Sequence, residues 1–159
     1  MFRLLLNLYR KLTESISLLE QESKFILAVE QLLTQQNKNH PVLQTAGREP
    51  RSVKTVRDYL KSHYAENISL SELASAANLS RFYLLRVFRN QMGVPPHEYQ
   101  TQVRITQARK LLRKGHSILD TAFETGFFDQ SHFSRNFKRI TGRTPGQYLS
   151  ESNIVQDAP

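Results

Sequence analysis

The sequence predicts an all-α protein with two helix-turn-helix subdomains joined by a long linker helix and preceded by an N-terminal helical pair. Apolar residues recur three, four and seven positions apart, and no segment alternates as a half-buried strand would. Residues 80–99 also match residues 129–148 at a constant shift of 49 positions, and residues 69–79 match residues 117–127 at a shift of 48. Such internal repetition is typical of a structural unit that occurs twice.

The N-terminal part of the chain carries two helical stripes, followed by a linker. Residues 37–51 lack periodicity and contain two prolines and a glycine, so they are predicted to separate residues 1–36 from the rest of the chain. The stripes that predict the helical pair consist of Leu5, Leu8, Leu12 and Leu19, followed by Phe25, Ile26, Val29, Leu32 and Leu33.

Residues 52–150 divide into helices at capping and stop residues. Ser52 is expected to cap the first helix, and Ser69 with Glu72 has the spacing of a capping box. Residues 151–159 add two acids and no base and are predicted to be a disordered tail. The longer helices are predicted at about residues 80–91, at residues 96–114 for the linker helix, and at about residues 129–141.

Each copy of the repeat consists of a short helix, a tight turn and a second helix, the helix-turn-helix unit. The turn carries Asn78 in the first copy and Gly126 in the second, two residue types that enter left-handed backbone conformations readily. Small residues, Ala74 and Ala122, allow the two helices of each copy to approach closely.

The second helix of each copy is expected to separate an apolar face from a basic face. The predicted inward residues are Leu84, Val87 and Phe88 in the first copy, and Phe133, Phe137 and Ile140 in the second. The predicted outward residues are Phe82, Leu85, Arg86 and Arg89 in the first copy, and Ser131, Ser134, Arg135 and Lys138 in the second.

The positive charge is confined to the repeated region. Residues 51–150 carry sixteen Lys and Arg against seven acids, whereas residues 1–50 carry six against five. A basic block of domain size favours a polyanionic partner, although a solvated basic surface is the alternative. Two equivalent basic helices suit duplex DNA, whose major groove admits one α-helix and repeats about every 34 Å. The linker helix, about 28 Å long, could space them accordingly.

These residues resemble the DNA-binding domain of the AraC/XylS family of bacterial transcription regulators. The resemblance covers about residues 52–150 and depends on many fixed spacings. In the second copy it consists of Ala108-Arg109-Lys110-Leu111-Leu112, Ile118, Ala122, Gly126-Phe127, Asp129, Ser131, Phe133, Arg135, Phe137-Lys138, Gly142, Thr144-Pro145 and Tyr148. In the first copy it consists of Ser80, Tyr83-Leu84, Arg86, Phe88, Gly93, Pro96 and Tyr99.

The resemblance implies a sequence-specific DNA-binding regulator, usually an activator, that inserts two helices into successive major grooves. By position, the base-reading candidates are Arg81, Phe82, Leu85, Arg86, Gln130, Ser131, His132 and Arg135. The candidates for contacting phosphates or positioning the helices are Ser80, Arg89, Asp129, Lys138 and Arg139. Each of them could instead be an ordinary surface residue, and Arg135 could pair with an acid such as Glu124.

The resemblance also bears on residues 1–36 and on partners. Many family members carry an N-terminal sensor barrel, and residues 1–36 resemble the paired helices that close such a sensor and form its dimer interface. The alternative is that these residues pack on the basic domain. The expected partners are double-stranded DNA, bacterial RNA polymerase and a second copy of the chain, in the bacterial cytoplasm and nucleoid. No membrane segment and no cofactor are expected.

Other functions fit the sequence less well. His97-Glu98 begins a zinc-protease motif, but position 101 is threonine and the five histidines lack metal-ligand spacing, so the chain is not expected to be an enzyme. A nucleoid protein that binds DNA without sequence preference is the alternative that the charge permits. An RNA-binding function fits less well because the sequence predicts no sheet with the aromatic platform that such modules use.

Overall fold

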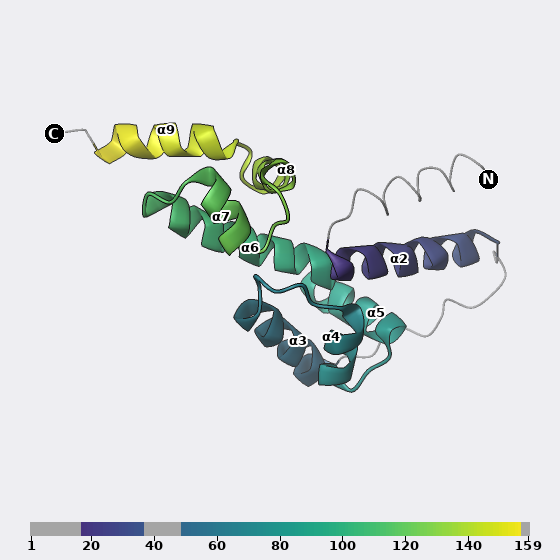
Figure 1. The fold of residues 1–159 in the computed structure, drawn as a ribbon. Helices are drawn as coiled ribbons and strands as arrows, with labels where there is room; N and C mark the ends of the chain where they lie inside the picture. The colour runs from purple at the N-terminus through teal and green to yellow at the C-terminus, as the bar shows by residue number, and fades with distance from the viewer. Residues whose placement is uncertain (1–16, 37–48, 157–159) are drawn as a thin grey trace. The chain divides into compact units, whose positions relative to one another are not determined.

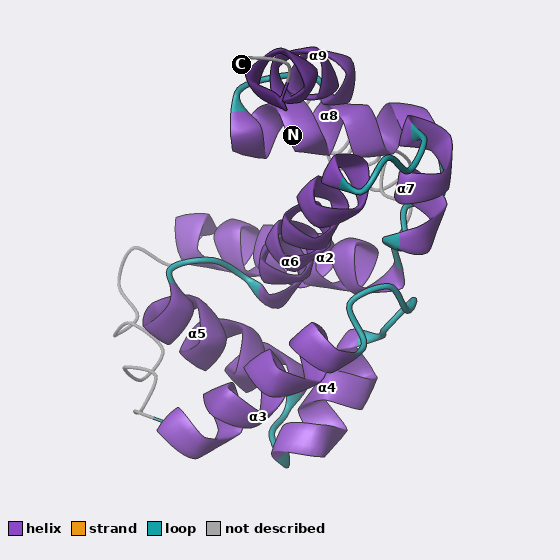
Figure 2. Ribbon diagram, turned by 90° about the vertical axis from the view of Figure 1, so that its left-hand side faces the viewer, coloured by secondary structure: helices purple, strands orange, loops and turns teal. Residues whose placement is uncertain are grey.

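The computed structural model describes residues 17–36 and 49–156, with side chains in 17–32 and 49–150, and every regular element in these ranges is a helix (Figures 1 and 2). The predicted all-α class is confirmed. The first helix of the predicted N-terminal pair and most of the linker lie outside the described residues. The described helices are α2 (Leu18–Gln36), α3 (Pro50–Ser62), α4 (Leu70–Ala77), α5 (Arg81–Met92), α6 (Pro96–Arg113), α7 (Ile118–Glu124), α8 (Gln130–Thr141) and α9 (Pro145–Gln156).

The chain forms two compact units. The first unit contains α2 to α5 and the first turn of α6, whereas the second contains the rest of α6, α7 to α9 and the short segment 63–66. Each unit therefore contains one complete helix-turn-helix pair, α4 with α5 or α7 with α8. The linker helix and the two second helices lie within one or two residues of their predicted positions.

The core of the first unit comes from four helices. Phe88 meets the ring of Tyr99 edge to face, with the ring centroids 5.7 Å apart. Helix α2 contributes Leu19 and Ile26, so part of the N-terminal stripe packs on the basic domain, while Phe25 and Leu32 stay exposed. The remaining buried residues include Val53, Val56, Leu60, Leu70, Leu73, Ala74, Leu84, Leu85, Val87 and Phe88.

The core of the second unit is a series of aromatic rings. Phe127, Phe133, Phe137 and Tyr148 make successive edge-to-face contacts with centroid separations of 5.3 to 5.5 Å. The aliphatic residues Ile105, Ala108, Leu112 and Ala122 complete this core. Phe127, Phe133 and Phe137 therefore anchor α8 to the body of the unit.

The two turns close in the same way, as the repeat predicts. The backbone N–H of Leu79 donates to the carbonyl of Ala74 at 2.9 Å, and that of Phe127 donates to the carbonyl of Ala122 at 2.9 Å. Asn78 has a φ of 53° and Gly126 a φ of 83°, both left-handed. A Cβ atom on Gly126 would lie 2.7 Å from the carbonyl carbon of Ala65 and closer still to its oxygen. Glycine is therefore required at position 126 for space as well as for conformation.

Two predicted boundaries are wrong. Helix α3 starts at Pro50 because proline is well suited to the first helical position, so Ser52 lies inside the helix and its hydroxyl donates to the carbonyl of Ala77 at 3.3 Å. Helix α9 continues to Gln156, so residues 151–156 are helical, where the sequence predicts disorder. No glycine or proline interrupts the chain between Gly146 and Gln156.

Candidate DNA-binding surface

Helix α5 presents the candidate residues of the first unit. Ser80 caps the helix, with its hydroxyl accepting a hydrogen bond from the N–H of Tyr83 at 3.3 Å. Behind the cap, Arg81 and Phe82 are exposed, the latter at 49%. An exposed phenylalanine beside an exposed arginine provides an apolar and a cationic contact on the same helical turn. The other basic candidates, Arg86 and Arg89, are half-buried and exposed, respectively.

The expectation that Leu85 lies on the outward face is wrong. Its side chain is 1% exposed and belongs to the core of the first unit. The reason is that α5 packs against both α3 and α4, so its buried arc is wide and includes two adjacent leucines, Leu84 and Leu85. A side chain so deeply buried cannot reach a base edge.

Helix α8 presents the candidate residues of the second unit. Asp129 caps it by accepting a hydrogen bond from the N–H of His132 at 2.7 Å. Gln130, Ser131 and Arg135 are exposed, and His132 is half-buried with its ring 5.5 Å from that of Phe127, edge to face. The helix thus has a rigid inner face and a polar outer face.

The last turn of α8 carries two exposed basic residues, Lys138 and Arg139. The guanidinium of Arg139 donates to the side-chain oxygen of Asn136 at 3.2 Å. Ile140, predicted to face inward, is instead 38% exposed. The aromatic core extends along α8 only from Phe133 to Phe137, which leaves Ile140 beyond its edge.

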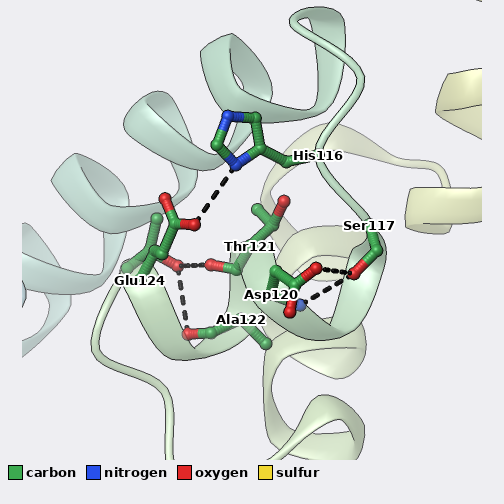
Figure 3. Close-up of polar contacts among 7 residues, drawn as sticks. His116, Ser117, Asp120, Thr121, Ala122 and Glu124 are labelled. Atoms are coloured by element: carbon green, nitrogen blue, oxygen red, sulfur yellow. Dashed lines mark hydrogen bonds and ion pairs between the residues drawn. The ribbon is translucent and has the colours of Figure 1, made fainter.

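Hydrogen bonds at both ends of α7 hold it in place (Figure 3). At its start, Ser117 Oγ accepts from the N–H of Asp120 at 3.0 Å and donates to Asp120 Oδ2 at 2.6 Å. At its end, Nδ1 of His116 lies 3.2 Å from Oε1 of Glu124. Glu124, the acid considered as an alternative partner for Arg135, therefore contacts a histidine instead.

One basic residue of the repeated region has a structural role. Arg104 of α6 is 5% exposed, and its guanidinium donates to the carbonyls of Tyr64 at 2.7 Å and Glu66 at 2.9 Å. The guanidinium also lies 5.6 Å from the ring centroid of Phe127. Gln100, one turn earlier, donates to the same two carbonyls at 3.1 Å. These side chains fix segment 63–66, and Arg104 is not available to DNA.

A further charged residue near α5 comes from α2. The carboxylate of Glu22 accepts a hydrogen bond from the N–H of Leu70 at 2.6 Å through Oε2, and its Oε1 lies 3.8 Å from Nη1 of Arg81. Sequence reasoning missed this contact because Glu22 lies 48 and 59 positions from its partners. No periodicity or capping signal could have revealed it.

Within the described ranges, the side chains offer no group of three or more His, Cys, Asp or Glu residues that could hold a metal ion. Nor does any helix in those ranges have both the length and the apolar character needed to cross a membrane.

Comparison with known proteins shows that this chain is similar to transcriptional regulators. A family model described as a helix-turn-helix domain matches residues 73–151. The chain is 38% identical over 126 residues to the uncharacterized HTH-type transcriptional regulator YbfI of Bacillus subtilis, covering 79% of this chain and 46% of YbfI. It is 40% identical over 82 residues to the HTH-type transcriptional activator RhaS of Klebsiella pneumoniae, covering 51% of this chain and 30% of RhaS. The chain thus matches less than half the length of either relative.

Solved structures share the fold. The DNA-binding domain of AdpA, a global transcriptional factor crystallised with a target DNA, superposes with a TM-score of 0.63 at 25% identity, covering 68% of this chain and 98% of that domain. The C-terminal domain of AraT, a response regulator from Geobacillus stearothermophilus, superposes with a TM-score of 0.61 at 28% identity. The superposition covers 66% of this chain and 88% of that domain.

Proposed function

Because the chain belongs to the AraC/XylS family of helix-turn-helix transcription regulators, we propose that it binds specific sequences of double-stranded DNA through α5 and α8. The observation that carries this proposal is the equivalence of these two helices. Each helix is capped at its N-terminus and carries an arginine at the same place in the repeat, Arg86 in α5 and Arg135 in α8. Buried side chains anchor both helices. They are Leu84 and Leu85 in α5, and Phe133 and Phe137 in α8.

By side-chain chemistry and position in the repeat, we divide the candidate residues into two groups. We propose that the cationic and amide groups read purine edges and that Phe82 contacts thymine methyl groups, because those pairings match the groups that bases present in the major groove. The base-reading group is Arg81, Phe82, Arg86, Gln130, Ser131, His132 and Arg135. The group that contacts phosphates or positions the helices is Ser80, Arg89, Asp129, Lys138 and Arg139.

The proposal extends to the role in transcription. The relative RhaS is described as a transcriptional activator, which supports an activating role for this chain. Activation implies contact with bacterial RNA polymerase, in the cytoplasm and on the nucleoid. Homodimerisation through residues 1–36 is part of the proposal and is supported by the exposed Leu18, Phe25 and Leu32, spaced seven residues apart along α2.

Selection from a pool of random duplex DNA, followed by sequencing of the bound fraction, tests this function. We expect a bipartite motif whose two half-elements are centred about one helical turn, roughly 10 base pairs, apart. Each half would be read by one helix. A pool that yields no enriched motif would instead favour the alternative, a nucleoid protein that binds DNA without sequence preference.

A further inference from the structure

Helix α2 brings one carboxylate to both helices of the first helix-turn-helix pair. The short hydrogen bond from the N–H of Leu70 places Glu22 at the N-terminus of α4. The other oxygen of the same carboxylate lies 3.8 Å from Arg81, the first residue of α5. One acidic side chain thus connects α2, α4 and α5.

The position of Glu22 is fixed by the packing of its helix. Leu19, Ser23 and Ile26 are all buried on the same face of α2, and the two apolar side chains belong to the core of the first unit. The N–H of Leu18 also donates to the side-chain oxygen of Asn67 at 3.1 Å, just before α4. Glu22 therefore points toward α4 and α5 because the helix that carries it is docked, and it is only 23% exposed.

The groups that Glu22 engages are of the kind that bind DNA, and Arg81 is one of the base-reading candidates. Free N–H groups at a helix N-terminus and arginine side chains are common phosphate contacts in protein–DNA complexes. A carboxylate that already occupies such groups competes with the duplex for them and adds a negative charge close to it. In the second unit, the residue equivalent to Arg81 is Gln130, which carries no charge and so offers a carboxylate no ion pair.

We propose that Glu22 restrains Arg81 and thereby weakens DNA binding by the first unit. In this inference, which rests on the proposed function, α2 is a built-in negative regulator of α5. Binding is strengthened when the charge on Glu22 is removed or when α2 moves away from α4. Helix α2 also carries the exposed stripe of Leu18, Phe25 and Leu32, through which a second copy of the chain is proposed to bind.

The variant Glu22→Gln removes the negative charge of the side chain but keeps its contact with α4. Its amide oxygen can still accept the hydrogen bond from Leu70, so α4 keeps its N-terminal contact, but the ion pair with Arg81 is lost. The matched control is Glu20→Gln, which removes one negative charge from the same helix at a residue paired with Lys24 at 2.7 Å. Thermal unfolding measurements on both variants check that they fold.

The test is the affinity of the full chain for its selected duplex, measured by fluorescence anisotropy at low and high salt. We expect Glu22→Gln to bind about two- to five-fold more tightly at low salt, the range of an exposed ion pair, with a smaller gain at high salt. In an Arg81→Gln background, Glu22→Gln should bring no gain, and Glu20→Gln should leave affinity unchanged.

Different outcomes overturn different claims. If the parent chain binds its selected sequence and Glu22→Gln binds no more tightly, the inference is wrong and the proposed function stands. An equal gain in the Arg81→Gln background, or from Glu20→Gln, also overturns the inference because the effect would then be general repulsion. If the parent chain selects no sequence, the proposed function fails first.

Discussion

Single residues in this chain have structural roles that their residue type alone does not reveal. Arg104 belongs by composition to the basic block, yet it is buried and its guanidinium satisfies two backbone carbonyls of segment 63–66. Glu22 belongs to a part of the chain with little net charge, yet it contacts the first helix-turn-helix pair. In both cases, the decisive partners are at least 38 positions away in the sequence. Charge counting therefore locates the basic region but does not reveal what its individual charged residues contact.

Gly126 provides the sharpest test at the scale of one residue. Replacement by alanine imposes an unfavourable left-handed conformation and forces Cβ against the backbone of Ala65, so we expect a loss of about 3 kcal/mol in the free energy of unfolding. Gly142 is the matched control, since its φ is +80° but nothing lies within 4 Å of an added Cβ. Gly142→Ala should cost about 1 kcal/mol. Equal losses in urea-induced unfolding would show that the contact with Ala65 is unimportant.

At the scale of an element, the sequence predicts the repeat and the helix ends well. Ser69 and Glu72 form the capping box that their spacing predicts, and Ser80, Ser117 and Asp129 cap α5, α7 and α8 in a similar way, because capping depends on local hydrogen bonds between residues three positions apart. The buried arc of a helix is less predictable, since it depends on how many neighbours the helix has. This explains why Leu85 is buried and Ile140 is exposed, against the expectation in each case.

The capping box of α4 makes a prediction about pH. The hydroxyl of Ser69, followed by its backbone N–H, lowers the pKa of Glu72 below its ordinary value of 4.5. A carboxyl whose pKa is lowered on folding stabilises the folded state above its unfolded pKa, and that contribution is lost as the pH falls through the folded pKa. Glu72→Gln should therefore lower the melting temperature at neutral pH but narrow its difference from the parent below pH 4.5. Melting curves that stay equally separated at all pH values would contradict this assignment.

At the scale of the whole molecule, two units repeat one design and differ in the residues that surround it. The second unit holds α8 with an aromatic core, whereas the first adds α2 and its carboxylate to α4 and α5. The sequence could predict the shared design because the repeat spacing is nearly constant. It could not predict the docking of α2, because the apolar stripe of that helix has no internal feature that specifies its partner.

The central claim is that α5 and α8 each read one half of the DNA site. Base preference measured at each position of the site tests this claim most directly. Selection from random DNA is repeated with Arg86→Ala, with Arg135→Ala and with the control Arg113→Ala, an exposed arginine in the last turn of α6. Loss of an arginine that contacts guanine removes about 1–3 kcal/mol of discrimination. We expect Arg86→Ala to relax preference in one half of the site, Arg135→Ala to relax it in the other half, and Arg113→Ala to leave both halves unchanged. If both recognition-helix variants weaken binding to all sequences equally, these helices contact only the DNA backbone and the account is wrong.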